Sequence, residues 1–272
     1  MSNYLQDKKK AGSQTWVAMK QRGEKIAMLT AYDYTMARII DTTSVDMILV
    51  GDSAANVMQG YESTVPMSVD EMIVYGRSVV RGAPHTFVVC DMPFGSYQVT
   101  AEEAVRNAIR IVQATGCDAV KLEGGEEIIE AVRGIIRAGI PVVAHLGLTP
   151  QYINIFGNYG VRAKDDTEAE KLKRDALLLA EAGCIAIVLE KIPAMLAMEV
   201  TASVKVPTIG IGAGAATDGQ VLVLQDMLGM NRGFAPKFLR KYANLFDDIA
   251  MAVSHYAADV KSISFPSSIE QY

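Results

Sequence analysis

The stretch AVKLEGGEE, Ala119 to Glu127, combines a short apolar run with two opposite charges. In an extended strand successive side chains point to opposite faces, so Val120 and Leu122 share one face while Lys121 and Glu123 share the other. Charged side chains are costly to bury without partners. In a barrel, the apolar face would pack against surrounding helices and the charged face would look into the lumen.

Similar apolar runs, rich in Val and Ile, recur along the chain. Between them lie longer stretches whose apolar residues recur with the period of an α-helix. We predict strands at Lys25–Tyr32, Asp46–Asp52, Thr86–Met92, Ala119–Gly124, Pro141–Gly147, Ile185–Glu190 and Pro207–Ala213. We place an eighth, short or irregular strand at Gly233–Phe238, because Pro236 lacks a backbone N–H.

The intervening stretches carry helix signals. Ser68 is followed three residues later by Glu71, the spacing of a capping box, and Thr100 is followed by Glu103 in the same way. Helices are predicted at 68–82, 100–116, 126–139, 166–183, 192–204 and 238–260.

Strand and helix therefore alternate about eight times, and the strands are apolar almost throughout, as parallel strands buried on both faces are. This pattern predicts an α/β fold, a TIM (β/α)8 barrel in a single domain, in preference to an open doubly wound sheet. We expect the barrel over residues 25–262, an N-terminal tail and lead-in helix over 1–24, and a C-terminal tail over 263–272.

The composition excludes several kinds of partner. The 272 residues are 50% hydrophobic and 21% charged, with a formal net charge of −5 and no block of basic residues. Nucleic acid and anionic lipid are therefore not expected partners. No apolar run reaches membrane-spanning length, so we expect a soluble, cytoplasmic protein without a membrane partner. Cys90, Cys117 and Cys184 are expected to be buried, reduced thiols and not a disulfide framework or zinc site.

Ionisable residues gather at the ends of five consecutive predicted strands: Asp52 with Ser53, Asp91, Lys121 with Glu123, His145, and Glu190. Each has an ordinary structural interpretation: Asp52 could cap the following helix, Glu190 could pair at the surface, and His145 could be a core histidine. Their coincidence at matching positions favours a functional site at the carboxyl end of a barrel.

Three of these residues, Asp52, Asp91 and Glu123, are natural oxygen ligands for a hard divalent cation such as Mg²⁺, which needs few protein ligands. Zinc fits poorly, because no histidine or cysteine cluster accompanies them. The glycine-rich segment Gly210–Gln220 could be a phosphate cradle at a helix N-terminus, although we favour a close-packed strand end and tight turn.

At these positions the sequence resembles the ketopantoate hydroxymethyltransferase family. The matching segments run in family order between about Lys25 and Phe238: LTAYDY, LVGDSAANVMQGYESTVPMSVDEM, RGAPHTFVVCDMPFGSY, AVKLEGG, HLGLTPQYINIFGNYGV, IVLEKIP and PTIGIGAGAATDGQVLV. Two departures are Ala54-Ala55, where many members have Leu-Gly, and GMNRGFAPKF, Gly229–Phe238, which matches less regularly.

The resemblance implies a TIM-barrel enzyme that transfers a hydroxymethyl group from 5,10-methylenetetrahydrofolate to 3-methyl-2-oxobutanoate, through an enolate stabilised by a divalent metal. The product, 2-dehydropantoate, leads to pantothenate. It also implies a homodecamer, built as a pentamer of dimers, with one Mg²⁺ per subunit. The implied residue roles are Mg²⁺ ligation by Asp52, Asp91 and Glu123, substrate contacts from Asp52, Ser53, Asp91, Lys121 and His145, and proton acceptance by Glu190.

Two other functions are weighed against this one. A lyase of the phosphoenolpyruvate mutase and isocitrate lyase superfamily, acting on another 2-oxo acid, would share the barrel and the metal, but such lyases usually carry a KKCGH-type loop that this sequence lacks. A non-catalytic barrel would predict an incomplete set of charges at the strand ends.

Overall fold

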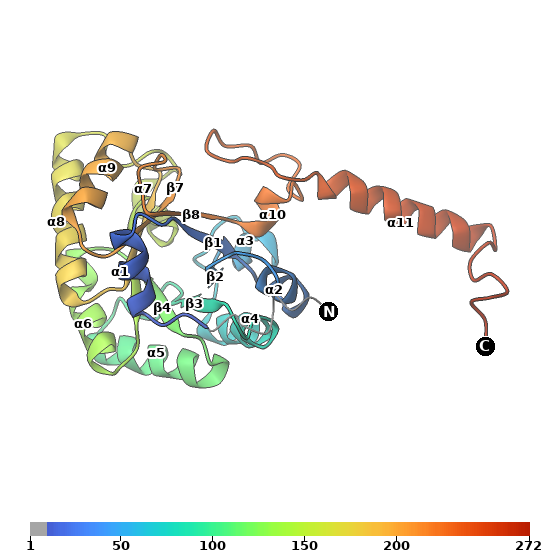
Figure 1. Ribbon diagram of the computed structural model, residues 1–272, viewed down its shortest axis with the longest axis horizontal. Helices are drawn as coiled ribbons and strands as arrows, with labels where there is room; N and C mark the ends of the chain where they lie inside the picture. The colour runs from blue at the N-terminus through green and yellow to red at the C-terminus, as the bar shows by residue number, and fades with distance from the viewer. Residues whose placement is uncertain (1–9) are drawn as a thin grey trace. The chain divides into compact units, whose positions relative to one another are not determined.

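The structure is a computed structural model and describes residues 10–272 (Figure 1). The first nine residues of the expected N-terminal tail lie outside the described part. The chain forms two compact units, which divide between Leu222 and Val223. The second unit contains α10 (Leu224–Met227) and α11 (Leu245–Lys261).

The first unit contains a closed barrel of eight parallel strands in sequential order, which confirms the predicted TIM barrel. The strands are β1 (Ile26–Thr30), β2 (Met47–Val50), β3 (Phe87–Asp91), β4 (Ala119–Glu123), β5 (Val142–Gly147), β6 (Ala186–Glu190), β7 (Thr208–Ile211) and β8 (Gly219–Leu222). Every residue of β2, β3 and β4 is buried, as expected for strands covered on both faces.

Helices surround these strands (Figure 1). They are α1 (Gln14–Gln21), α2 (Tyr34–Asp41), α3 (Ala54–Val57), α4 (Val69–Gly82), α5 (Ala101–Thr115), α6 (Ile129–Arg137), α7 (Ile153–Phe156), α8 (Asp166–Ala182) and α9 (Ala194–Ser203), with short 3₁₀ turns at Glu126–Ile128 and Pro150–Tyr152. The predicted capping box is present at the start of α4: the Ser68 side chain accepts from the Glu71 N–H, and the Glu71 carboxylate accepts from the Ser68 N–H.

The predicted eighth strand was wrong. Gly233–Phe238 contains no strand, and β8 lies earlier, within and just after the glycine-rich segment. The chain returns from β7 to β8 through residues 212–218 without a helix, and the Thr208 N–H donates to the Asp218 carboxylate (2.9 Å). A four-residue strand that begins at a glycine carries too little apolar pattern to be recognised.

The glycine-rich segment forms strand ends and a tight return, as we favoured, and no helix begins within it. A Cβ at Gly210 would lie 2.7 Å from the Thr217 Oγ1 atom, so close packing requires glycine there. The last predicted helix was wrong at its start: α11 begins at Leu245, seven residues after the expected Phe238.

Side chains fill the barrel lumen in layers. At its amino end, Trp16 and Met19 of α1 pack against inward-facing strand residues, and the Trp16 ring meets Phe87 edge to face, with centroids 5.2 Å apart. The apolar layers above are built from alternate strand residues: Ile26, Met28, Met47, Leu49, Phe87, Val89, Ala119, Val143, Ala186, Val188, Ile209 and Val221.

The same alternation continues towards the carboxyl ends of the strands. Two residues beyond Val89, Ala119, Val143 and Val188, the inward positions are Asp91, Lys121, His145 and Glu190, and Glu123 lies two residues beyond Lys121. The barrel register aligns Asp91 with Lys121 and Glu123 with His145. The fold thereby collects these side chains above the apolar layers, as predicted.

Gly147, at the end of β5, lies where two strand ends come close together. Its φ is +92°, and an added Cβ would lie 2.3 Å from the Glu190 carbonyl oxygen. That oxygen accepts a hydrogen bond from the Leu148 N–H (2.9 Å). Gly139 has a similar φ of +87° with no atom near its Cβ position.

We therefore expect Gly139→Ala to lower the free energy of unfolding by on the order of 1 kcal/mol, from backbone strain alone. Gly147→Ala should cost about 1–3 kcal/mol more, because the strand ends must separate. Denaturant unfolding of both variants beside the wild type measures the difference. Equal costs would contradict the close approach of β5 and β6.

Candidate active site

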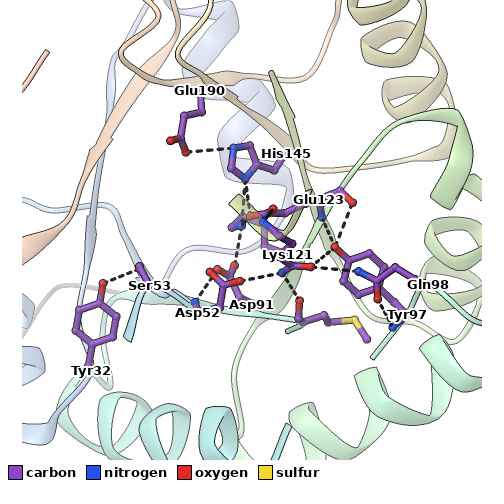
Figure 2. Close-up of polar contacts among 12 residues, drawn as sticks. Tyr32, Asp52, Ser53, Asp91, Tyr97, Gln98, Lys121, Glu123, His145 and Glu190 are labelled. Carbon is purple, nitrogen blue, oxygen red and sulfur yellow. Dashed lines mark hydrogen bonds and ion pairs between the residues drawn. The ribbon is translucent and has the colours of Figure 1, made fainter. Parts of the chain in front are cut away.

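The predicted site residues come together at the carboxyl end of the barrel. In Figure 2, Asp91, Lys121, Glu123 and His145 point toward one another, and Glu190 lies beyond His145. Each comes from a different position along the barrel wall: Asp52 and Ser53 follow β2, Asp91 ends β3, Lys121 and Glu123 lie on β4, His145 on β5 and Glu190 at the end of β6.

Lys121 is the central cation of this group and is 3% exposed. Its Nζ atom lies 3.0 Å from Asp91 Oδ1 and 3.5 Å from Glu123 Oε1. Burial alone would lower the pKa of Lys121, but the carboxylates of Asp91, Glu123 and Asp52 raise it above its ordinary value. The ammonium therefore stays charged.

The three buried carboxylates respond differently to this environment. Burial and repulsion from Asp91 and Glu123 raise the pKa of Asp52 well above its ordinary value. Burial also raises the pKa of Asp91, although Lys121 opposes the shift. For Glu123, burial is outweighed by Lys121 and His145, and the pKa is lowered. Negative charge is thus in excess beside Asp52 and Asp91.

His145 lies between two carboxylates. Its Nδ1 atom is 3.2 Å from Glu123 Oε1, and its Nε2 atom is 3.4 Å from Glu190 Oε2, at ion-pair distance but without hydrogen-bond geometry. Burial and Lys121 lower the pKa of His145, but hydrogen bonding and charge from Glu123 and the contact with Glu190 raise it to about 9. These two carboxylates favour the imidazolium form of His145, although the Lys121 Nζ atom lies 3.4 Å from its Nδ1 atom.

Ser53 lies at the edge of the group and is held by a residue that sequence reasoning missed. Its hydroxyl forms a 2.8 Å hydrogen bond with the Tyr32 hydroxyl, just after β1. Gly51 makes room for this arrangement, since a Cβ there would lie 2.6 Å from Ser53 Oγ. The Asp52 side chain does not cap the following helix; its Oδ2 atom accepts from Gln151 Nε2 (2.9 Å).

Two further buried residues around the group were also missed. The Tyr97 hydroxyl accepts from the Glu123 N–H (3.1 Å) and donates to Gln151 Oε1 (2.6 Å). Both residues are neutral; Tyr97 lies in a loop and Gln151 in the 3₁₀ turn Pro150–Tyr152, so neither charge nor periodicity marks them. The sequence signal that could have found them is that both lie within segments that resemble the family.

The donor set suits a divalent cation of the Mg²⁺ type. Within residues 10–272, no three His, Cys, Asp or Glu side chains converge into a ready coordination shell. Mg²⁺ does not require one, because it usually takes one or two carboxylates and completes its shell with water and substrate. Asp52 and Asp91 are neighbours, since the Asp52 N–H donates to Asp91 Oδ2 (3.0 Å). A bound cation would relieve the repulsion that raises the pKa of Asp52.

Other predictions concern the rest of the described chain. Cys90, Cys117 and Cys184 are free and buried, as expected. Among residues 10–272, no helix combines the length and apolar character needed to cross a bilayer.

Solved structures share this fold at low sequence identity. A phosphonopyruvate hydrolase in complex with oxalate and Mg²⁺ aligns with a TM-score of 0.60 and 13% identity, over 95% of this chain and 92% of the other. A 2,3-dimethylmalate lyase of the PEP mutase/isocitrate lyase superfamily aligns with a TM-score of 0.56 and 14% identity, over 90% and 98%. At these identities the similarity concerns the fold alone.

Sequence relatives are far closer. The chain is 59% identical to a 3-methyl-2-oxobutanoate hydroxymethyltransferase of Bacteroides fragilis over 273 aligned positions, and 57% identical to one of Flavobacterium johnsoniae, with 100% of each chain covered. The family model described as ketopantoate hydroxymethyltransferase matches residues 10–268. With the barrel and its ring of charges in place, these matches establish that the chain belongs to the ketopantoate hydroxymethyltransferase family.

Proposed function

We propose that this enzyme transfers a hydroxymethyl group from 5,10-methylenetetrahydrofolate to 3-methyl-2-oxobutanoate, giving 2-dehydropantoate for pantothenate biosynthesis. The observation that carries the proposal is the buried cluster of Lys121 with Asp52, Asp91 and Glu123, faced by His145 and Glu190, in a chain of this family. Such a cluster suits an anionic oxo acid together with a divalent cation. The proposed setting is cytoplasmic, and the proposed assembly is a homodecamer with one Mg²⁺ per subunit.

Asp52, Asp91 and Glu123 would hold the Mg²⁺, directly or through water. When bound, the ion would supply positive charge against the negative charge that develops on the ketone oxygen during proton removal. Asp52, Ser53, Asp91, Lys121 and His145 are the proposed substrate contacts. Lys121, already charged and fixed by its ion pairs, would attract the substrate carboxylate without needing to reorganise.

Glu190 is the proposed proton acceptor. Its side chain is 16% exposed, more than the other carboxylates of the group, so it lies at the accessible edge of the cluster. It would take the proton from C3 of the oxo acid. The imidazolium of His145 beside it would hold the carboxylate in place. A C–C bond would then form between C3 and the folate methylene carbon as one of the two C–N bonds of that carbon breaks. Water would replace the second C–N bond and supply the hydroxyl oxygen. The two freed nitrogens would take up the proton held by Glu190 and one from water, and tetrahydrofolate would leave.

A coupled assay with the oxo acid and methylenetetrahydrofolate tests the function as a whole. Release of tetrahydrofolate with formation of 2-dehydropantoate supports the proposal. Cleavage of another 2-oxo acid without any need for folate would favour the superfamily lyase. No turnover of either kind would favour a non-catalytic barrel.

Glu190→Gln should abolish exchange of the C3 proton with deuterium, because the amide cannot accept it, while the oxo acid still binds. Proton NMR of 3-methyl-2-oxobutanoate in D₂O measures the exchange. Glu199→Gln is a matched control, since Glu199 is an exposed residue of α9 whose partner is Lys173 (2.7 Å). Exchange at the wild-type rate in Glu190→Gln would remove Glu190 as the base.

Removal of divalent ions tests the proposed metal. Dialysis against a chelator should abolish C3 exchange, because Lys121 and His145 would then face the developing charge without the ion. Added Mg²⁺ should restore the exchange. The exchange rate is followed by the same NMR measurement. Full activity after thorough chelation would contradict the metal proposal.

The protonation of His145 predicts a pH dependence of stability. Its pKa in the folded protein, about 9, exceeds the ordinary value of 6.5, so the folded state binds the proton more tightly. The resulting stabilisation, on the order of 3 kcal/mol, is complete below about pH 6.5 and is lost as pH rises through about 9. The difference in free energy of unfolding between wild type and His145→Gln, measured in chelator, should therefore shrink from pH 6 to pH 10. A constant difference would contradict the imidazolium.

A further inference from the structure

Gln151 is a buried neutral residue that touches the proposed metal site from outside it. It lies in the 3₁₀ turn Pro150–Tyr152 that follows β5 and is 2% exposed. The turn contributes none of the charged residues of the site. The position of Gln151 is nevertheless defined by contacts to three other strand ends.

All four hydrogen-bonding positions of its side-chain amide are used. The Nε2 group donates to Asp52 Oδ2 (2.9 Å) and to the Met92 carbonyl (3.0 Å). The Oε1 atom accepts from the Tyr97 hydroxyl (2.6 Å) and from Gln98 Nε2 (3.2 Å). A glutamine amide can form two bonds on each side, so this one is saturated.

These partners also fix which way the amide faces. The Met92 carbonyl can only accept, and the Gln98 NH₂ can only donate. Rotating the Gln151 amide by 180° would place its oxygen against the Met92 carbonyl oxygen and its NH₂ against the Gln98 NH₂. Gln151 must therefore present its N–H to Asp52. The Tyr97 hydroxyl lies 3.1 Å from both the N–H and the carbonyl oxygen of Glu123 and 2.6 Å from Gln151 Oε1, and is compatible with this orientation.

The backbone of Gln151 reaches a second proposed ligand. Its N–H donates to Glu123 Oε2 (3.0 Å). Pro150 before it has no N–H, so this donor is the first one that the turn offers. A single residue thus holds one oxygen of Asp52 through its side chain and one oxygen of Glu123 through its main chain.

We propose that Gln151 is a positioning residue for the metal site, which sets the orientation of Asp52 and, with Tyr97, ties it to Glu123. The inference rests on the proposed Mg²⁺ site of the preceding subsection. Residues that orient metal ligands affect metal affinity strongly, typically by 10–100-fold on mutation. Gln151 acts through Asp52 and Glu123, so its effect should appear in ion binding itself.

Gln151→Met keeps the length of the side chain and removes all four of its hydrogen bonds. We expect the affinity of the full-length protein for Mn²⁺ alone, measured from the EPR signal of free Mn²⁺, to fall 10–100-fold. Tyr97→Phe leaves the amide and removes one of its anchors, so it should cause a smaller loss in the same direction. Excess Mg²⁺ should partly restore C3 exchange in Gln151→Met, an effect that a merely structural role would not produce.

Thr201→Val is the control for lost stability. It breaks a buried 2.7 Å hydrogen bond to Thr208, between α9 and β7, and should leave the affinity for Mn²⁺ unchanged. Wild-type affinity in both Gln151→Met and Tyr97→Phe would overturn the inference while leaving the metal site intact. Absence of Mn²⁺ binding in the wild type would instead overturn the metal proposal, and this inference with it. If Gln151→Met does not fold, Tyr97→Phe decides.

Discussion

A lysine ammonium that is almost completely removed from water has to be balanced by carboxylates, and this requirement organises the carboxyl end of the barrel. Lys121 meets Asp91 from the neighbouring strand and Glu123 from its own. Both contacts follow from the parallel register and the two-residue period of the strands. With Asp52 added, the negative charge of the carboxylates exceeds the positive charge of Lys121. Positive charge on His145 offsets part of this excess beside Glu123 and Glu190. The remaining negative charge favours binding of a divalent cation. Removing one partner of the cluster would leave a buried charge uncompensated.

Much of this arrangement could be predicted from the sequence because it depends on local periodicity. In β3, β4, β5 and β6 the inward-facing positions change from apolar to ionisable without a break in the alternation, so the lumen-facing residues can be identified from each strand alone. β8 could not be identified in this way. It has four residues, begins at a glycine, and follows β7 without an intervening helix, so it shows neither an apolar run nor the strand–helix alternation.

Tyr32, Tyr97 and Gln151 could not be predicted for a different reason. They are uncharged, and their contacts depend on how loops fold back over the strand ends. Local sequence pattern holds no information on which loop atom meets which carboxylate. The difference between strands and loops also bears on how family and fold are recognised. Enzymes at 13–14% identity share the barrel, whereas the relatives at 57–59% identity align over the whole chain, loops included. A barrel architecture alone therefore does not specify the chemistry.

The packing of α1 against the amino end of the lumen bears on kinetics. Trp16, Met19 and the apolar layers above them fill that end and separate the charged cluster from it. When a site is open at one end only, the molecule that binds deepest has to bind first and leave last. For the proposed substrates, a short oxo acid and a much larger folate, access from the carboxyl end of the barrel would favour binding of the oxo acid before the folate and release of the spent folate before the product.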